Sequence, residues 1–120
     1  MLPARFRMRR KAHFTLTVRR GSRAGRELLS AHLLFRAQAT GEPPLVGFVV
    51  SKSVGSAVVR NRVRRRLRSA VRGYLPSLPG GSLLVVRAHP QAATAHQADL
   101  AAELDAVMGR LMRRQVGALR

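Results

Sequence analysis

Apolar residues recur with a helical period between Val59 and Tyr74. At about 100° per residue, the apolar side chains of this segment fall within one arc of roughly 120°. They are Val59, Val63, Leu67, Ala70, Val71 and Tyr74. Ser56, next to Gly55, carries a hydroxyl that can accept a hydrogen bond from the first free backbone N–H groups of a helix. The pattern therefore predicts an amphipathic helix with one side in a hydrophobic core.

The pattern of residues 9–20 indicates a shorter helix near the start of the chain. Phe14 and Val18 are four residues apart and would share its buried face, and Gly21 follows as a helix end. Phe14 is most simply an anchor in the core. The alternative is an aromatic side chain that stacks on a base at an exposed surface.

Three segments predict strands. Residues 27–37 alternate between apolar and polar side chains, which is typical of a strand that is buried on one face. Its predicted apolar face consists of Leu29, Ala31, Leu33 and Phe35. Residues 45–52 predict a second strand that becomes polar at its end, and residues 83–88 form a short apolar run that predicts a strand buried on both faces.

A last helix is predicted from Thr94, as its N-cap, to about Arg114. Its expected buried stripe consists of Leu100, Leu104, Val107, Met108 and Leu111. Acidic residues gather in the first half of this segment and arginines in the second, which is the arrangement that a helix dipole favours.

Charge changes the interpretation of the helix at 59–74. The segment holds seven arginines and no acidic residue, so like charges lie four residues apart at Arg60, Arg64, Arg68 and Arg72. A solvated cationic helix face is the simplest explanation of such a run. However, a solvated helix usually intersperses glutamate with its basic residues. The missing counter-charge favours a negatively charged partner outside the chain.

The whole chain is also strongly basic. Its 120 residues suffice for one domain, and its formal net charge is +18. Of the 23 basic residues 21 are arginine, which favours bidentate phosphate contacts, although a GC-rich genome would also enrich arginine. We expect a flexible basic arm at residues 1–8, an RNA-binding domain at 9–116 and a short tail at 117–120.

Composition excludes several classes of protein. Cysteine is absent, which excludes disulfides and thiolate sites, and no apolar run approaches the roughly 20 residues of a membrane span. No signal-peptide pattern follows the basic start. The sequence thus predicts a soluble cytoplasmic protein without membrane partners.

Protein-borne catalysis is not expected. No acidic residue lies between Glu42 and Asp99, the four histidines lack metal-ligand spacing, and no GxSxG motif occurs. The basic composition instead indicates nucleic acid. Four phenylalanines and one tyrosine are too few for an extended stacking platform, so contacts with the phosphates and the shape of a folded RNA fit best.

One motif carries a family resemblance. A strand ending in Ser-Lys, a Val-Gly turn and a helix with Arg-Asn-Arg follow one another at Ser51, Lys52, Val54, Gly55, Arg60, Asn61 and Arg62. With these elements in this order, the chain resembles the protein subunit of bacterial ribonuclease P, and the resemblance covers nearly its whole length. Ser53 and Ser56 stand where many members have lysine and asparagine, and Arg66 stands where the family often has an apolar residue and can offset the missing charge.

The resemblance implies that this chain is a single-domain α+β protein, a two-layer α-β sandwich like the second domain of ribosomal protein S5. Its elements would follow the order α-β-β-β-α-β-α, with a left-handed β-α-β crossover. The general rule for such crossovers is right-handed. The additional strand would fall near residues 23–26, which the residue pattern alone predicts to be a turn or a short irregular strand.

The resemblance also implies a function. The family assists a catalytic RNA in Mg²⁺-dependent removal of the 5′ leader from precursor tRNA, most simply with one protein per RNA, and the Mg²⁺ is held mainly by the RNA subunit and the substrate. Contacts with the RNA subunit would come from Ser51, Lys52, Arg60, Asn61, Arg62, Arg64, Arg65 and Arg68. The leader would lie in a cleft between the first helix and the sheet face, lined by Arg10, Lys11, Phe14, Phe35 and Phe48. For Lys52, a solvated strand end is the alternative.

Two other classes remain open at this stage. A structural RNA-binding protein, for example of the ribosome, would explain the charge and the size. An independent metal-dependent nuclease would need carboxylates that the pattern does not provide.

Overall fold

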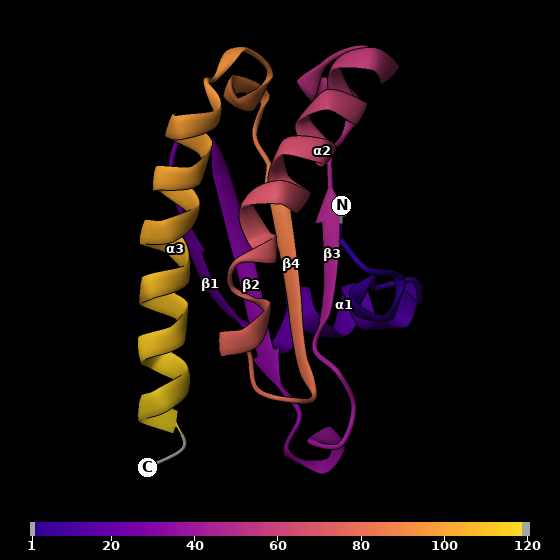
Figure 1. Ribbon diagram of the computed structural model, residues 1–120, viewed down its shortest axis with the longest axis vertical. Coiled ribbons are helices and arrows are strands. Elements are labelled where there is room, and N and C mark those ends of the chain that lie inside the picture. The colour runs from indigo at the N-terminus through magenta and orange to yellow at the C-terminus, as the bar shows by residue number, and fades with distance from the viewer. Residues whose placement is uncertain (1, 119–120) are drawn as a thin grey trace.

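Strand β4 (Ser82–Ala88) lies inside a four-stranded mixed sheet. The computed structural model describes residues 2–118 (Figure 1). β4 pairs in antiparallel fashion with β2 (Leu29–Phe35) and in parallel with β3 (Leu45–Val49). The short strand β1 (Ser22–Gly25) pairs with β2, so the strand order is β1-β2-β4-β3. β1 confirms the additional strand that the family resemblance implies.

Helices cover both faces of this sheet. α1 (Lys11–Arg20) lies on one face, and α2 (Ala57–Arg72) and α3 (Gln97–Ala118) lie on the other (Figure 1). Alternate residues of β4 enter the two cores: Leu83 packs in the cluster beneath α1, and Leu84 packs in the larger cluster beneath α2 and α3. Both are fully buried, as the apolar run predicts.

The connection from β3 through α2 to β4 is left-handed. With both strands running upward in Figure 1, α2 lies on the near side and β4 lies to the left of β3. This confirms the α+β class and the order α-β-β-β-α-β-α. The crossover is uncommon because twisted parallel strands usually favour the opposite hand.

The amphipathic pattern of α2 is confirmed. Val63, Leu67 and Val71 are fully buried against the sheet. The Ser56 hydroxyl caps the helix by accepting a hydrogen bond from the backbone N–H of Val59 at 3.3 Å. Gly55, with φ of 153°, makes the turn that precedes this cap. Sequence and structure therefore agree on where the arginine helix begins and which face it buries.

Three local predictions are wrong. β2 is buried on both faces, because on the side away from α2 and α3 Leu34 packs in the cluster beneath α1 and Ser30 contacts His89. On α1 the buried residue is Thr17, whose hydroxyl donates to the carbonyl of His13, whereas Val18 is 40% exposed. Helix α3 begins at Gln97 instead of after Thr94.

The segment before α3 explains its later start. Pro90–Thr94 forms a 3-10 helix, and the carbonyl of His96 then accepts hydrogen bonds from the backbone N–H groups of Asp99 and Leu100. The predicted buried stripe of α3 is nevertheless confirmed, because its register does not depend on the cap. Near the other end of α2, the Tyr74 hydroxyl donates to Asp105 of α3 at 2.6 Å. Burial and this hydrogen bond raise the pKa of Tyr74 to about 12, so the hydroxyl keeps its proton.

Both ends of the chain bear on the expected domain limits. Residues 2–8, expected to form a flexible arm, contact the edge of β3: Leu2 is fully buried, and Met8 donates its backbone N–H to the carbonyl of Val46 at 2.8 Å. Of the expected tail at 117–120, α3 includes 117–118, and 119–120 lie outside the described residues. None of the described helices is both long and apolar enough to cross a membrane.

Candidate nucleic-acid interface

The arginines of α2 divide between two flanks of the helix. On the flank toward α3, the Arg66 guanidinium donates to the carbonyl of Ala95 at 2.9 Å, and Arg62 makes a longer hydrogen bond of 3.5 Å to the carbonyl of Ala93. These two side chains therefore help to hold the segment that leads into α3. The structure thus gives Arg62 an internal contact that the motif by itself does not reveal.

The opposite flank of α2 faces the edge strand β3. Arg64 and Arg68 lie on it one turn apart, and the Arg64 guanidinium donates to the side-chain oxygen of Asn61 at 3.0 Å. Asn61 thus orients an arginine of the predicted RNA-binding set. Arg65 is exposed and, with Ser69 and the residues just named, lines a basic hollow on the surface of the helix.

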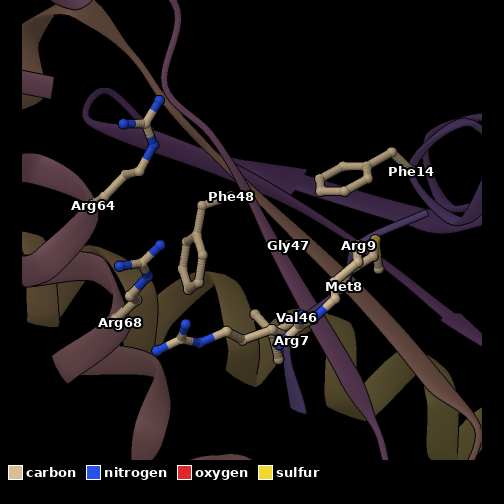
Figure 2. Close-up of a pocket in the computed structure, with 9 residues that line it drawn as sticks. All are labelled: Arg7, Met8, Arg9, Phe14, Val46, Gly47, Phe48, Arg64 and Arg68. Atoms are coloured by element: carbon tan, nitrogen blue, oxygen red, sulfur yellow. The ribbon is translucent and has the colours of Figure 1, made fainter. Parts of the chain in front are cut away.

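A cavity of about 330 Å³ separates this flank from the N-terminal segment (Figure 2). Its floor is β3, and its walls come from α2 on one side and from the segment before α1 on the other. The lining residues are Arg7, Met8, Arg9, Phe14, Val46, Gly47, Phe48, Arg64 and Arg68. Four of the nine are arginine and none is acidic, so the cavity is suited to anions.

The predicted leader residues fall into two groups. Phe14 and Phe48 line this cavity from opposite sides of β3, with Gly47 between them (Figure 2). A Cβ atom at Gly47 would lie only 2.4 Å from the Phe14 ring, so the glycine permits that approach. Phe35 pairs with Ser82 at the end of β2 and does not line the cavity.

The expected common sheet face is therefore not observed. Phe48 packs against the cluster beneath α2 and α3, whereas Phe14 packs against the cluster beneath α1. Phe35 lies two residues after Leu33 and shares its face, again away from α1. The cause is strand parity, since a difference of one residue moves every side chain of a strand to the other face. Arg10 and Lys11 are exposed at the start of α1.

The Ser-Lys motif lies beyond the sheet. β3 ends at Val49, earlier than predicted, and Lys52 begins a 3-10 turn that leads to the α2 cap. Ser51 and Ser53 are exposed and share a hydrogen bond of 2.7 Å between their hydroxyls. Arg60 follows in the first turn of α2, and its Nε atom is buried without a hydrogen-bond partner among the described residues.

Arg7 and Arg9 are functional candidates that sequence reasoning missed. It placed Arg7 in a flexible arm and Arg9 at the start of the predicted first helix, and it gave neither a role in binding. The Arg7 Nε atom donates to the carbonyl of Leu2 at 2.9 Å, which fixes the direction of its guanidinium group. The available signal was the apolar residues of the arm, Leu2, Phe6 and Met8, all of which pack against the two cores.

Acidic residues gather away from this basic surface. Glu27, Asp99 and Glu103 line a separate hollow beside the start of α3, where Glu103 accepts from the backbone N–H of Leu28 at 2.8 Å. Within residues 2–118 the ion pair is between Arg36 and Glu42, at 3.5 Å. Internal ion pairs therefore do not neutralise α2.

Metal binding finds no support in the part of the chain that the structure describes. No group of three or more His, Cys, Asp or Glu side chains there could hold a metal ion. Among the described residues, the lining of the groove consists of arginine, apolar and aromatic side chains and glycine, without a carboxylate.

The stability of the fold is expected to decrease in acid because of two histidines, the buried His32 and the partly buried His13. Burial lowers the pKa of His32, as do Arg23 and Arg87; burial together with Arg36 and Arg10 lowers the pKa of His13, against a weaker opposing effect of Glu42. Below about pH 6.5 the unfolded chain binds protons that the folded chain resists. We expect stability to be constant above that pH and to fall as the pH decreases toward the folded-state pKa values.

Urea unfolding between pH 5 and 8 measures this dependence. In the variant H13Q/H32Q the slope below pH 6.5 should be smaller, even if the variant is less stable at pH 8. An equal slope in both proteins would show that other groups cause the acid sensitivity.

Comparison with known proteins agrees with the motif. The ribonuclease P family model matches residues 2–112. Relatives named ribonuclease P protein component include one from Streptomyces griseus, 54% identical over 118 residues that cover 93% of this chain and 96% of that protein. Another, from Thermobifida fusca, is 54% identical over 114 residues that cover 90% of this chain and 77% of that protein.

Solved structures share the fold. The RNase P protein of Staphylococcus aureus matches with a TM-score of 0.77 at 19% identity and covers 87% of this chain and 93% of that one. The RNase P protein of Thermotoga maritima, in complex with 1-(4-fluorophenyl)-2-thiourea, matches with a TM-score of 0.71 at 21% identity over 89% of this chain and 98% of that one.

Proposed function

Because this chain belongs to the ribonuclease P family and is a protein component of that endoribonuclease, we propose how it takes part in the reaction. It binds the catalytic RNA subunit and the 5′ leader of precursor tRNA, and it assists the endonucleolytic removal of the leader. One protein would act with one RNA subunit, in the cytoplasm, where tRNA precursors are processed. The hydrolysis itself is assigned to the RNA.

The convergence of four arginines on one groove carries this proposal. Arg7 and Arg9 come from the N-terminal segment, and Arg64 and Arg68 come from α2, with no acid among the lining residues. Like charges at this spacing destabilise the isolated protein. A polyanion that neutralises them therefore stabilises the folded protein when it binds. An RNA backbone supplies that charge in a continuous line.

Contacts with the RNA subunit are proposed for the start and outer flank of α2 and for the turn before it. They comprise Ser51, Lys52, Arg60, Asn61, Arg62, Arg64, Arg65 and Arg68. Arg62 retains further guanidinium N–H groups besides the one directed to Ala93. Asn61 would act partly through Arg64, which it orients.

Contacts with the leader are proposed around Phe14 and Phe48, with Arg10 and Lys11 beside them at the start of α1. Phe35 lies outside this cavity, so the leader could contact it only by continuing along β2. The acidic hollow beside α3 would face away from RNA, because its carboxylates repel phosphates.

Magnesium in this proposal belongs to the RNA. The described residues offer no carboxylate cluster of the kind that Mg²⁺ prefers. The contribution of the protein is instead its positive charge, which lowers the repulsion between the phosphates of the catalytic RNA and those of the precursor.

Cleavage assays at low Mg²⁺ test the proposal. We expect the protein to stimulate leader removal by its cognate catalytic RNA, and the RNA-free protein with Mg²⁺ to cleave nothing. The advantage should shrink at high Mg²⁺, because the metal then screens the same phosphate repulsion.

Failure to stimulate would contradict the proposal. A control with an equally basic but unrelated protein separates specific assistance from simple charge screening. Recovery of ribosomal RNA, instead of one folded RNA and precursor tRNA, upon purification from cells would favour a general RNA-binding role.

A further inference from the structure

The Arg66 side chain makes a short internal hydrogen bond on the flank of α2 that faces α3. Its guanidinium group donates to the carbonyl of Ala95 at 2.9 Å, in the segment that leads from β4 into α3 (Figure 1). We propose that Arg66 is a positioning residue for RNA recognition: through this segment it holds Arg62 in the orientation in which Arg62 contacts the catalytic RNA. This inference rests on the proposed function and gives a role to an arginine outside its set of RNA contacts.

The segment between β4 and α3 needs such a tie. Ala92 is fully buried in the larger core and anchors its first part. Beyond that point Ala93 and Ala95 are only partly buried, and the backbone N–H of Ala95 reaches the carbonyl of Ala92 over 3.4 Å. Arg66 holds this part twice, because its guanidinium binds Ala95 and its own carbonyl accepts from the Gln97 side chain at 3.3 Å. The position of Ala93 therefore depends on Arg66.

The orientation of Arg62 depends in turn on Ala93. One Nη atom of Arg62 donates to the carbonyl of Ala93 at 3.5 Å. The Nε atom of Arg62 is buried without a hydrogen-bond partner among the described residues, so the terminal nitrogen atoms are the ones left for RNA. A guanidinium group that is already held in place loses less conformational freedom when a phosphate binds. Part of the ordering cost is thus met in the free protein.

Arg66 itself is poorly placed to bind phosphate. Its partner Ala95 also lines the hollow that contains Glu27, Asp99 and Glu103, and these carboxylates repel an RNA backbone. The Arg66 side chain is also half-buried. Its removal should therefore change how strongly RNA binds, but not how many phosphates the protein contacts.

Arg66→Met tests the inference, because methionine keeps an unbranched side chain and a high helix propensity but cannot donate to Ala95. Arg72→Met is the matched control. Arg72 is exposed in the last turn of the same helix and lies outside the proposed RNA contacts, and its replacement removes the same charge. Thermal unfolding identifies a temperature at which every variant is fully folded. Binding to the catalytic RNA is then measured at that temperature over a range of salt concentrations.

We expect Arg66→Met to weaken binding about three- to tenfold, which is the cost of ordering one long side chain that was previously fixed. The slope of log K against log salt should not change, because RNA can still order Arg62 and contact it. Arg62→Met, in contrast, should make the slope less steep by about 0.9 for a lost duplex phosphate contact. Arg72→Met should bind within about twofold of the wild-type protein, since an exposed charge away from the RNA is screened.

The combined variant Arg62→Met/Arg66→Met tests whether Arg66 acts through Arg62. In that case the second substitution should weaken binding by less than about twofold beyond Arg62→Met alone. Arg66→Lys keeps a donor for the single bond to Ala95, which is not bidentate, so it should bind within about twofold of the wild-type protein. A purely structural role would lower the melting temperature and leave the affinity of the folded protein unchanged.

Several results would overturn the inference. Arg66→Met could bind within twofold of the wild-type protein, Arg72→Met could cause an equal loss, or Arg66→Lys could bind as weakly as Arg66→Met. A less steep salt slope in Arg66→Met would make Arg66 a phosphate contact, and an undiminished loss in the Arg62→Met background would show that it does not act through Arg62. If the wild-type protein binds the catalytic RNA in these cases, only the role of Arg66 is wrong. If it does not bind that RNA at all, the proposed function fails as well.

Discussion

Replacing Arg64, Arg65 and Arg68 together by glutamine is expected to weaken binding to the catalytic RNA by more than about a hundredfold. Each arginine that contacts a phosphate contributes about 1 kcal/mol or more, and charge-assisted contacts are the stronger ones. Glutamine has a helix propensity close to that of arginine and keeps an unbranched polar side chain, so α2 should still form. Filter binding or fluorescence titration over a range of salt concentrations measures the loss.

The salt dependence separates contact from mere proximity. The slope of log K against log salt should become less steep by about 0.9 for each duplex phosphate contact that is removed. Arg26, Arg110 and Arg113 are exposed outside the groove and α2. Their replacement by glutamine removes the same net charge and should cost much less affinity. Equal losses in the two triple variants would show that overall charge, and not the α2 flank, binds the RNA.

Leu67→Ala is expected to destabilise the fold by about 2–5 kcal/mol, the range for deleting a buried leucine side chain. Leu67 is fully buried in the middle of the face that α2 packs against the sheet. The free energy of unfolding of a native protein is only about 5–15 kcal/mol. The net charge of +18 lowers it further, because the charges in the compact state repel one another. The variant should therefore unfold at clearly lower urea concentration.

Val58→Ala is the matched control in the same helix. Val58 is 75% exposed, so its truncation should change stability by less than about 0.5 kcal/mol. Leu67 is buried against the sheet and so does not itself contact RNA. The folded variant should therefore still bind the catalytic RNA, and excess RNA should raise the melting temperature of Leu67→Ala. A variant that melts as the wild-type protein does, or that RNA fails to stabilise, would contradict this account of how α2 is held.

The arginine helix was predictable because its signals are local. The period of Val63, Leu67 and Val71 fixes the buried face, and the cap at Ser56 fixes the first turn. β4 was predictable for a similar reason, since a short continuous apolar run fits a strand covered on both sides. In both cases one physical preference dominates within a few residues.

Predictions failed where distant segments decide. β2 alternates in sequence, yet it is buried on both faces, because α1 packs over Leu34 and His89 contacts Ser30 on the second face. The N-terminal segment has the charge of a solvated arm, but Leu2 and Met8 fix it to the edge of β3. The apolar residues of the N-terminal segment indicate that it is buried, but no pattern within either segment specifies which distant part of the chain covers it.

The candidate site shows the same division. The motif from Ser51 to Arg62 and the excess of arginine were sufficient to predict an RNA partner and the family. They did not show that Arg66 holds the segment before α3, or that Arg7 faces Arg64 and Arg68 across a groove.

Sequence alone determined that one helix would bury an apolar stripe and carry uncompensated positive charge, because periodicity and composition are properties of consecutive residues. Only the tertiary structure decided how that charge is used. The left-handed crossover places α2 beside the edge strand, and the N-terminal segment closes the other side of Phe48. A groove needs two walls, and here the walls are separated by about half of the chain, so local preferences could not specify it.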